Sequence, residues 1–198
     1  MPFRDEPEPP LDVNRIMMVF ATHGIDYVLV GGVGAQRHGA TRVTQDFDAV
    51  IDRAEENVDR TIAALTELDA FWRVDGMSDY DARHLTVDMK WLMTSQPPLL
   101  VRTAAGDIDI LASIPDSNGL PMDYAKLKLN ADSETAGSVQ VVVAGLDDII
   151  ASKRFANRQK DREALPELEA IQSSQAPVSG MGTMPTKSDE LSPPFLML

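Results

Sequence analysis

Residues 27–51 constrain this chain more than any other stretch, because an apolar run, a glycine turn and two spaced acids follow one another there. The β-branched run over residues 27–30 predicts a buried strand. Gly31 and Gly32 come next, and two glycines after a strand let the backbone turn sharply and approach a ligand closely. The short helix that we expect over residues 33–38 would present free backbone N–H groups, which suit phosphate. We therefore interpret Gly31 and Gly32 as nucleotide-binding residues.

The stretch returns as a second strand that carries Asp46, Phe47 and Asp48. Side chains alternate along a strand, so the two carboxylates share one face and Phe47 points into the core. Two adjacent carboxylates repel each other and need a counter-charge. A divalent metal supplies that charge, and oxygen ligands on a rigid strand suit Mg²⁺. The pattern predicts that Asp46 and Asp48 are metal ligands and catalytic residues.

A third acid on a neighbouring strand would complete such a site, and both Asp107 and Asp109 are available. Asp109 lies between Ile108 and Ile110, inside an otherwise apolar strand, so its charge needs a functional reason. Asp107 follows Gly106 and could merely close a turn. We favour Asp109 as the third ligand and leave Asp107 open. Three carboxylates around one or two Mg²⁺ ions are the apparatus of nucleotidyl transfer from an NTP.

Basic residues near these acids are candidates for binding phosphate. Arg42 lies between the glycine turn and the acids, where its guanidinium can fork onto phosphate oxygens. Lys153 falls on the apolar stripe of a helix expected over residues 146–171, so it points inward and needs an anionic partner. Asp161 follows as either a second acid facing the cleft or a helix cap. We count Lys153 and Asp161 as catalytic candidates, and Arg42 and Lys153 as nucleotide-binding ones.

The charge balance limits the partners. A formal net charge of −13 over 198 residues argues against a general nucleic-acid coat protein. One basic patch departs from this balance and would flank the cleft, where a polyanion could lie. The patch consists of Arg154, Arg158, Lys160 and Arg162.

Cysteine is absent, which excludes disulfides and thiolate metal sites. The N-terminal residues do not resemble a signal peptide, and no apolar run is long enough to span a bilayer. We therefore expect a soluble, cytoplasmic protein without a membrane partner.

The rest of the pattern predicts one domain over residues 11–172, with a disordered tail over 1–10 and a flexible, Ser- and Pro-rich tail over 173–198. The other expected elements are helices over 11–23, 54–70 and 124–129, strands over 84–92 and 139–143, a hairpin of 99–102 with 107–111, an irregular loop over 72–83, turn residues over 113–137, and a break near 157–161 in the last helix.

These motifs resemble a known family. Val-Gly-Gly, Asp-Phe-Asp and Ile-Asp-Ile resemble the signature of the DNA polymerase β-like nucleotidyltransferase superfamily. Leu-Asp-Asp-Ile-Ile-Ala-Ser-Lys over residues 146–153, followed by Asn-Arg-Gln-Lys-Asp-Arg over 157–162, resembles the MenT and AbiEii branch, the nucleotidyltransferase toxins of toxin–antitoxin systems. The similarity spans about residues 14–172.

The resemblance implies an α+β, polymerase β-like nucleotidyltransferase fold: a small mixed sheet with helices on one side, the acids on adjacent strands, and a C-terminal helical segment. It implies a toxin that transfers NMP, for instance from CTP or UTP, to the 3′ acceptor end of tRNA and so blocks aminoacylation and translation. Mg²⁺ would be the cofactor, and a cognate antitoxin the protein partner. On this resemblance Asp46 and Asp48 hold metal, Lys153 is a functional lysine and Asp161 is the late acid. The tRNA substrate that it implies makes the four residues of the basic patch, Arg154, Arg158, Lys160 and Arg162, possible tRNA-binding residues.

Two other functions stay open. One is nucleotidyl transfer to a protein or to a cationic aminoglycoside, which an acidic protein would suit. The other is a catalytically silent regulatory binding protein, against which an intact set of acids argues. Independently of these, Thr41 and Thr44 lie close to the acids in the chain. We expect phosphorylation of either hydroxyl to repel a triphosphate.

Overall fold

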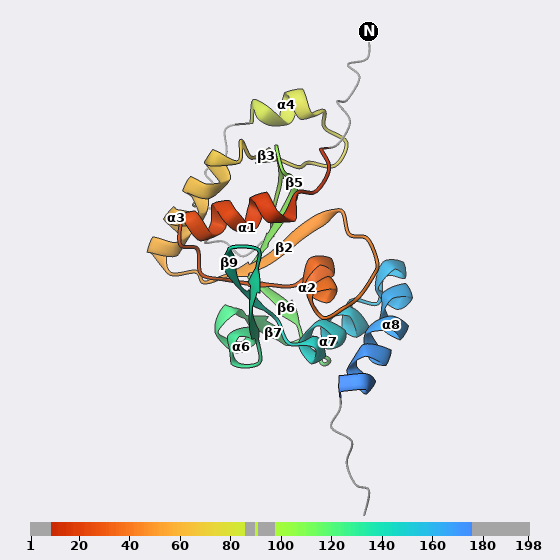
Figure 1. The fold of residues 1–198 in the computed structure, drawn as a ribbon. Coiled ribbons are helices and arrows are strands. Elements are labelled where there is room, and N and C mark those ends of the chain that lie inside the picture. Colours follow the sequence, from red (N-terminus) through yellow and green to blue (C-terminus); the bar gives the residue numbers. More distant parts are fainter. Residues whose placement is uncertain (1–8, 86–89, 91–97, 176–198) are drawn as a thin grey trace, which may run out of the picture.

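The computed structural model describes residues 9–85, 90 and 98–175, coloured along the chain in Figure 1. The expected strand over residues 84–92 falls mostly outside these residues, as do most of the two expected tails. The last helix continues to Gln175, which places the first three residues of the expected C-terminal tail in a helix. In the part of the chain that the structure describes, no helix has both the length and the apolarity needed to cross a membrane.

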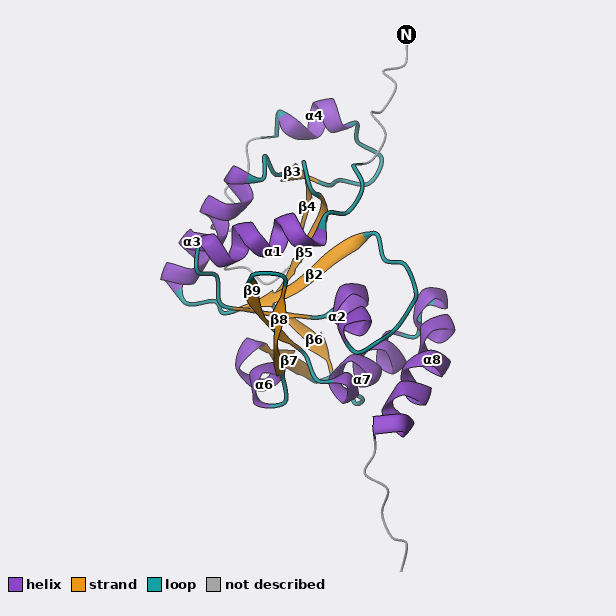
Figure 2. Ribbon diagram, viewed as in Figure 1, coloured by secondary structure: helices purple, strands orange, loops and turns teal. Residues whose placement is uncertain are grey.

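Seven strands form one mixed sheet in the order β3-β4-β5-β2-β1-β9-β8 (Figure 2). The strands are β1 (Tyr27–Leu29), β2 (Asp46–Ile51), β3 (Phe71–Trp72), β4 (Leu99–Thr103), β5 (Gly106–Leu111), β8 (Asp132–Ala136) and β9 (Val139–Val143). The β2·β5 and β1·β9 pairs are parallel, and the other four pairs are antiparallel. A separate hairpin is formed by β6 (Ser113–Pro115) and β7 (Pro121–Asp123). The predicted α+β class with a mixed sheet and flanking helices is confirmed.

Helices cover both faces of the sheet, so the expectation of helices on one side is wrong. They are α1 (Val13–Thr22), α2 (Gly31–Arg37), α3 (Glu55–Glu67), α4 (Asp79–Arg83), α6 (Tyr124–Leu129), α7 (Leu146–Ala156) and α8 (Gln159–Gln175). One core joins α1 and α3 to Tyr27 and Leu29, and the other joins α6, α7 and α8 to Val28 and Val30. Because β1 is apolar on both faces, each face needs a cover. Figure 1 shows α2, α7 and α8 gathered on one side of the molecule.

Local signals set most helix boundaries where the sequence predicts them. The Asp12 carboxylate accepts a hydrogen bond from the backbone N–H of Arg15 and starts α1. Gly24, with φ of 64°, follows the end of that helix in the left-handed region. Asn157, with φ of 48°, ends α7 and separates it from α8, which confirms the predicted break.

Two stretches carry more structure than the sequence pattern predicts. The segment over 72–83, expected as a loop, contains α4, and Trp72 belongs to the short strand β3. The segment over 113–137 contains β6, β7 and β8 besides the expected helix α6. β8 is mostly exposed and polar, so it has no hydrophobic alternation to reveal it. Its pairing with β9 satisfies its backbone instead.

Candidate functional site

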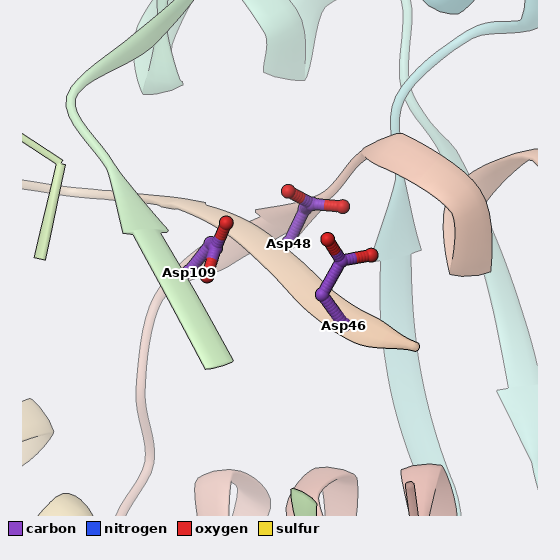
Figure 3. Close-up of side chains that lie close together, drawn as sticks. All are labelled: Asp46, Asp48 and Asp109. Carbon is purple, nitrogen blue, oxygen red and sulfur yellow. The ribbon is translucent and has the colours of Figure 1, made fainter. Parts of the chain in front are cut away.

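The acids come together because β2 and β5 pair in parallel and in register. Phe47 lies opposite Ile108, and Asp48 opposite Asp109. Residues paired in this way point to the same face of a sheet, so the fully buried Phe47 and Ile108 fill one core while the acids face the other side. One carboxylate oxygen from each of Asp46, Asp48 and Asp109 lies within 4.8 Å of the other two (Figure 3). We call these three residues the acid cluster.

Asp107, the alternative third ligand, is held by two arginines instead. Its carboxylate accepts hydrogen bonds from Nε of Arg102 at 2.9 Å and from Nη1 of Arg73 at 2.8 Å. Burial alone would raise the pKa of Asp107, but the hydrogen bonds and charges of Arg102 and Arg73 outweigh it and lower the pKa below its ordinary value. Asp107 is therefore neutralised by two arginines, whereas the acid cluster as a whole is compensated only in part.

The acid cluster carries negative charge that the protein compensates only in part. Burial, followed by the charges of Asp46 and Asp109, raises the pKa of Asp48 to about 7. Burial also raises the pKa of Asp109, and the guanidinium of Arg73 offsets that rise only partly. Converging carboxylate oxygens with a shortage of positive charge fit a hard divalent cation such as Mg²⁺. The residues present thus suit the metal, which stays a prediction.

The glycine turn runs directly against the acid cluster. Gly31 has φ of 61°, and a Cβ atom there would lie 1.9 Å from Oδ2 of Asp48. A Cβ on Gly32 would lie 2.3 Å from Oγ1 of Thr44, whose hydroxyl donates to Oδ1 of Asp46 at 2.8 Å. Only glycine permits this approach. The chain changes direction at Gly31 as expected, but the helix begins there and not at residue 33, so both glycines belong to α2.

α7 and α8 bring the predicted cations to the cluster. Lys153 is 15% exposed, and its Nζ lies 3.6 Å from Oδ1 of the fully buried Asp161. Asp161 also accepts hydrogen bonds from Nε of Arg158 at 2.7 Å and from the backbone N–H of Arg158 at 3.2 Å. It therefore acts both as a cap of α8 and as the ionic partner of two cations. Nζ of Lys160 lies 3.7 Å from Oδ2 of Asp46.

These groups line one cavity of about 860 Å³. Its predicted site residues are Gly31, Gly32, Arg42, Asp46, Asp48, Asp109, Lys153, Arg158, Lys160 and Asp161. Thr44 and Ser152 add hydroxyl groups. Its apolar lining residues include Leu100, which lies opposite Asp109 on β4, and Leu111, two residues after Asp109 on β5. The cavity thus joins an acidic end to a basic side, an arrangement that suits an anionic molecule held through a metal.

The predicted basic patch does not act as one surface. Arg158 and Lys160 line the cavity, whereas Arg154 pairs with Glu169 at 2.7 Å on the exposed side of α7 and α8. Arg162 donates to the backbone carbonyl of Asn157 and is not among the residues lining the cavity.

Sequence reasoning missed Arg73, which donates to Oδ1 of Asp109 through Nη2 at 2.6 Å. Arg73 lies in the segment expected as an irregular loop, and its place depends on β3 pairing with β4. No local pattern in the sequence signals that contact. The sequence predicts only a regulatory role for the Thr44 hydroxyl, because its contact with Asp46 depends on how the loop before β2 folds.

No family model and no curated protein matches this sequence. Among solved structures, the chain is similar to a crystal structure of ANT(2")-Ia in complex with adenylyl-2"-tobramycin. The sequence identity is 12%, the match covers 82% of this chain and 93% of that chain, and the TM-score is 0.48. At this level the similarity does not define what this chain binds or transfers.

Proposed function

We propose that this protein is a Mg²⁺-dependent nucleotidyltransferase. The observation that carries the proposal is the acid cluster, set against a glycine turn and flanked by Lys153 and Lys160 in one cavity. Asp46, Asp48 and Asp109 would hold one or two Mg²⁺ ions. When bound, the metal supplies charge neutralisation for the triphosphate and a lowered pKa for the attacking hydroxyl.

Other residues of the cavity would bind the triphosphate, and one carboxylate would accept a proton. Gly31 and Gly32 allow the triphosphate to lie against the backbone, and Arg42 and Lys153 provide cations for its oxygens. Asp109, at the end of the cavity nearest Leu100, is the carboxylate that takes the proton of the acceptor hydroxyl. The hydroxyl oxygen bonds to the α-phosphorus, and the bond from that phosphorus to pyrophosphate breaks.

We further propose that the acceptor is the 3′ end of tRNA and that the donor is an NTP such as CTP or UTP, as the MenT-like motifs imply. The cavity supports an anionic acceptor over a polycationic one. Outside the acid cluster, the only carboxylate among its described lining residues is Asp161, which already pairs with Arg158 and Lys153. An aminoglycoside would find no further acid to bind its amines there. The blocked translation, the cognate antitoxin and the cytoplasmic location are parts of the same proposal.

Incubation of the pure protein with total tRNA, Mg²⁺ and each α-labelled NTP tests the function. We expect label on tRNA from one or two nucleotides, lost when the metal is chelated and lost in Asp48→Ala. Glu169→Gln, which changes an exposed acid that is not among the residues lining the cavity, should retain activity and serves as the matched control. Absence of label from folded wild-type protein with all four nucleotides would remove the proposal.

The same assay separates the alternatives. Label on an aminoglycoside or a protein, but not on RNA, would retain nucleotidyl transfer and replace the acceptor; the net charge of −13 is the observation that favours this second candidate. A silent binding protein would keep its cellular effect in Asp48→Ala, whereas a toxin enzyme would lose it. Purification from the native operon without any bound protein would contradict the antitoxin partner.

A further inference from the structure

We propose that Arg73 is the positioning residue that makes Asp109, rather than Asp107, the third metal ligand. The inference rests on the proposed function and deepens it. It begins from the pairing of β2 with β5, in which Asp46 lies opposite Asp107 just as Asp48 lies opposite Asp109. All four carboxylates share one face of the sheet. Register alone therefore does not select the third ligand.

The two arginines break this equivalence. Oδ1 of Asp107 accepts a hydrogen bond from Nε of Arg102 at 2.9 Å, and its Oδ2 accepts from Nη1 of Arg73 at 2.8 Å and from Nη2 of Arg102 at 3.3 Å. Both of its oxygens are used. Only Oδ1 of Asp109 accepts a hydrogen bond, from Nη2 of Arg73 at 2.6 Å, and no hydrogen bond among the described residues involves its Oδ2. One oxygen of Asp109 is thereby fixed while the other is available to a metal.

The guanidinium of Arg73 is well placed to hold the carboxylate of Asp109 in one orientation. Its side chain is 25% exposed, and its backbone N–H donates to the carbonyl of Leu100 at 3.0 Å, beside β5. Arg102, 12% exposed, is held in turn by Asp79 of α4 at 3.2 Å. The planar fork of an arginine spans two carboxylates with one nitrogen each, which a lysine cannot do. Arg73 therefore fixes the rotation of Asp109 against repulsion from Asp46 and Asp48.

Hydrogen-bonding partners of metal ligands contribute strongly to affinity: removal typically costs about 10–100-fold. Without Arg73, Asp109 would turn away from the other two acids and would contribute less to a bound cation. The contribution of Asp109 can be measured as the factor by which Asp109→Asn weakens Mn²⁺ binding. A residue that positions Asp109 must change that factor, whereas a residue that only adds charge or stability leaves it unchanged.

The test is a double-mutant cycle on the full chain, read as the Kd for Mn²⁺ from the free-ion electron paramagnetic resonance signal. We expect Asp109→Asn to weaken binding by about tenfold in the wild type and by less than about threefold in Arg73→Gln. Arg102→Gln is the matched control, because it removes one guanidinium from Asp107 and none from Asp109. In that background Asp109→Asn should again cost about tenfold. Arg73→Lys should restore only part of the coupling.

Equal losses in the wild-type and Arg73→Gln backgrounds, or no loss on Asp109→Asn in the wild type, would overturn the inference. Circular dichroism and thermal unfolding of each variant confirm that the comparison is made on folded protein. Because the readout is metal binding without turnover, a failure of this inference can be told apart from a failure of nucleotidyl transfer. Wild-type protein that binds Mn²⁺ through Asp109 but transfers no nucleotide would retain the role of Arg73 and remove the enzyme.

Discussion

The ammonium of Lys153 lies 3.6 Å from Oδ1 of Asp161, a carboxylate with no exposed surface. Nε of Arg158 donates to its other oxygen at 2.7 Å. Burial would raise the pKa of Asp161, but Arg158 and Lys153 outweigh it and lower the pKa below its ordinary value. One buried acid thus holds two cavity-lining cations that come from different sides of the α7–α8 break.

Asp161→Asn is expected to destabilise the protein and to lower its activity, because it leaves Lys153 largely buried without its counter-charge. We expect a loss of about 2 kcal/mol in the free energy of unfolding, measured by urea denaturation at pH 7. Glu169→Gln removes the exposed pair with Arg154 and should cost less than about 0.5 kcal/mol. Equal losses of stability in the two variants would contradict the role of Asp161 as the buried ionic partner of Lys153 and Arg158.

The raised pKa of Asp48 predicts a pH dependence of stability in metal-free protein. Between the ordinary value of 3.8 and the folded value of about 7, the folded state binds a proton at Asp48 that the unfolded state releases. The contribution of this group to stability is therefore fully present below about pH 4 and is lost as the pH rises through 7. Asp48→Asn should be more stable than the wild type at pH 8 in EDTA.

Added Mg²⁺ should reverse that order, by stabilising the wild type at pH 8 and leaving Asp48→Asn nearly unchanged. Thermal unfolding of both proteins at pH 4, 6 and 8, with and without metal, checks the prediction. A difference between the two proteins that does not vary with pH would mean that Asp48 titrates normally.

Gly31→Ala and Gly24→Ala form a matched pair for the glycine turn. Both glycines have positive φ, 61° and 64°, so both substitutions should cost about 1–2 kcal/mol of backbone strain. A Cβ at Gly24 meets nothing within 4 Å, whereas one at Gly31 overlaps the carboxylate of Asp48. We expect Gly24→Ala to retain activity and Gly31→Ala to lose at least about a hundredfold in kcat/KM. Comparable activities would show that the turn need not approach the acid.

Thr44 and Thr41 have different surroundings in the structure, although the sequence gives no reason to distinguish them. Thr44 lines the cavity and donates to Asp46, whereas Thr41 donates to Oε1 of Glu167 at 2.8 Å. A negative charge at Thr44 would repel both the acid cluster and a triphosphate. Thr44→Glu should therefore abolish activity, while Thr41→Glu should lower it less than about threefold. Full activity of Thr44→Glu in the labelled-NTP assay would exclude phosphorylation there as an inhibitory switch.

Much of the site can be predicted from the sequence, because the positions of its acids follow from the alternation of side chains along single strands. Asp46, Phe47 and Asp48 alternate along one strand, and Asp109 stands between two buried isoleucines, so the pattern reports which faces they occupy. The register of β2 with β5 depends on residues about sixty positions apart, and no local pattern encodes it. The sequence therefore does not decide between Asp107 and Asp109, and the contacts of Asp107 with Arg73 and Arg102 separate the two.

The elements of the fold that the sequence predicts are likewise those with a local pattern of residues. Apolar spacing and glycines marked α1, β1, β2 and α7. The exposed strand β8 and the short strand β3 are formed by pairing with a neighbour, so their own composition does not reveal them. The family resemblance implies helices on one side of the sheet only. The structure has helices on both sides, because β1 is buried on both faces and each face needs a cover.

The in-register pairing of β2 with β5 has a consequence for how this chain can change over evolutionary time. A slip of one residue between the two strands would turn a carboxylate toward Phe47 and would expose an isoleucine to the cavity. Insertions or deletions within either strand therefore damage folding and chemistry at once. Changes in length between the two strands are tolerated only where they leave β3, β4 and Arg73 in place, because Arg73 fixes the carboxylate of Asp109.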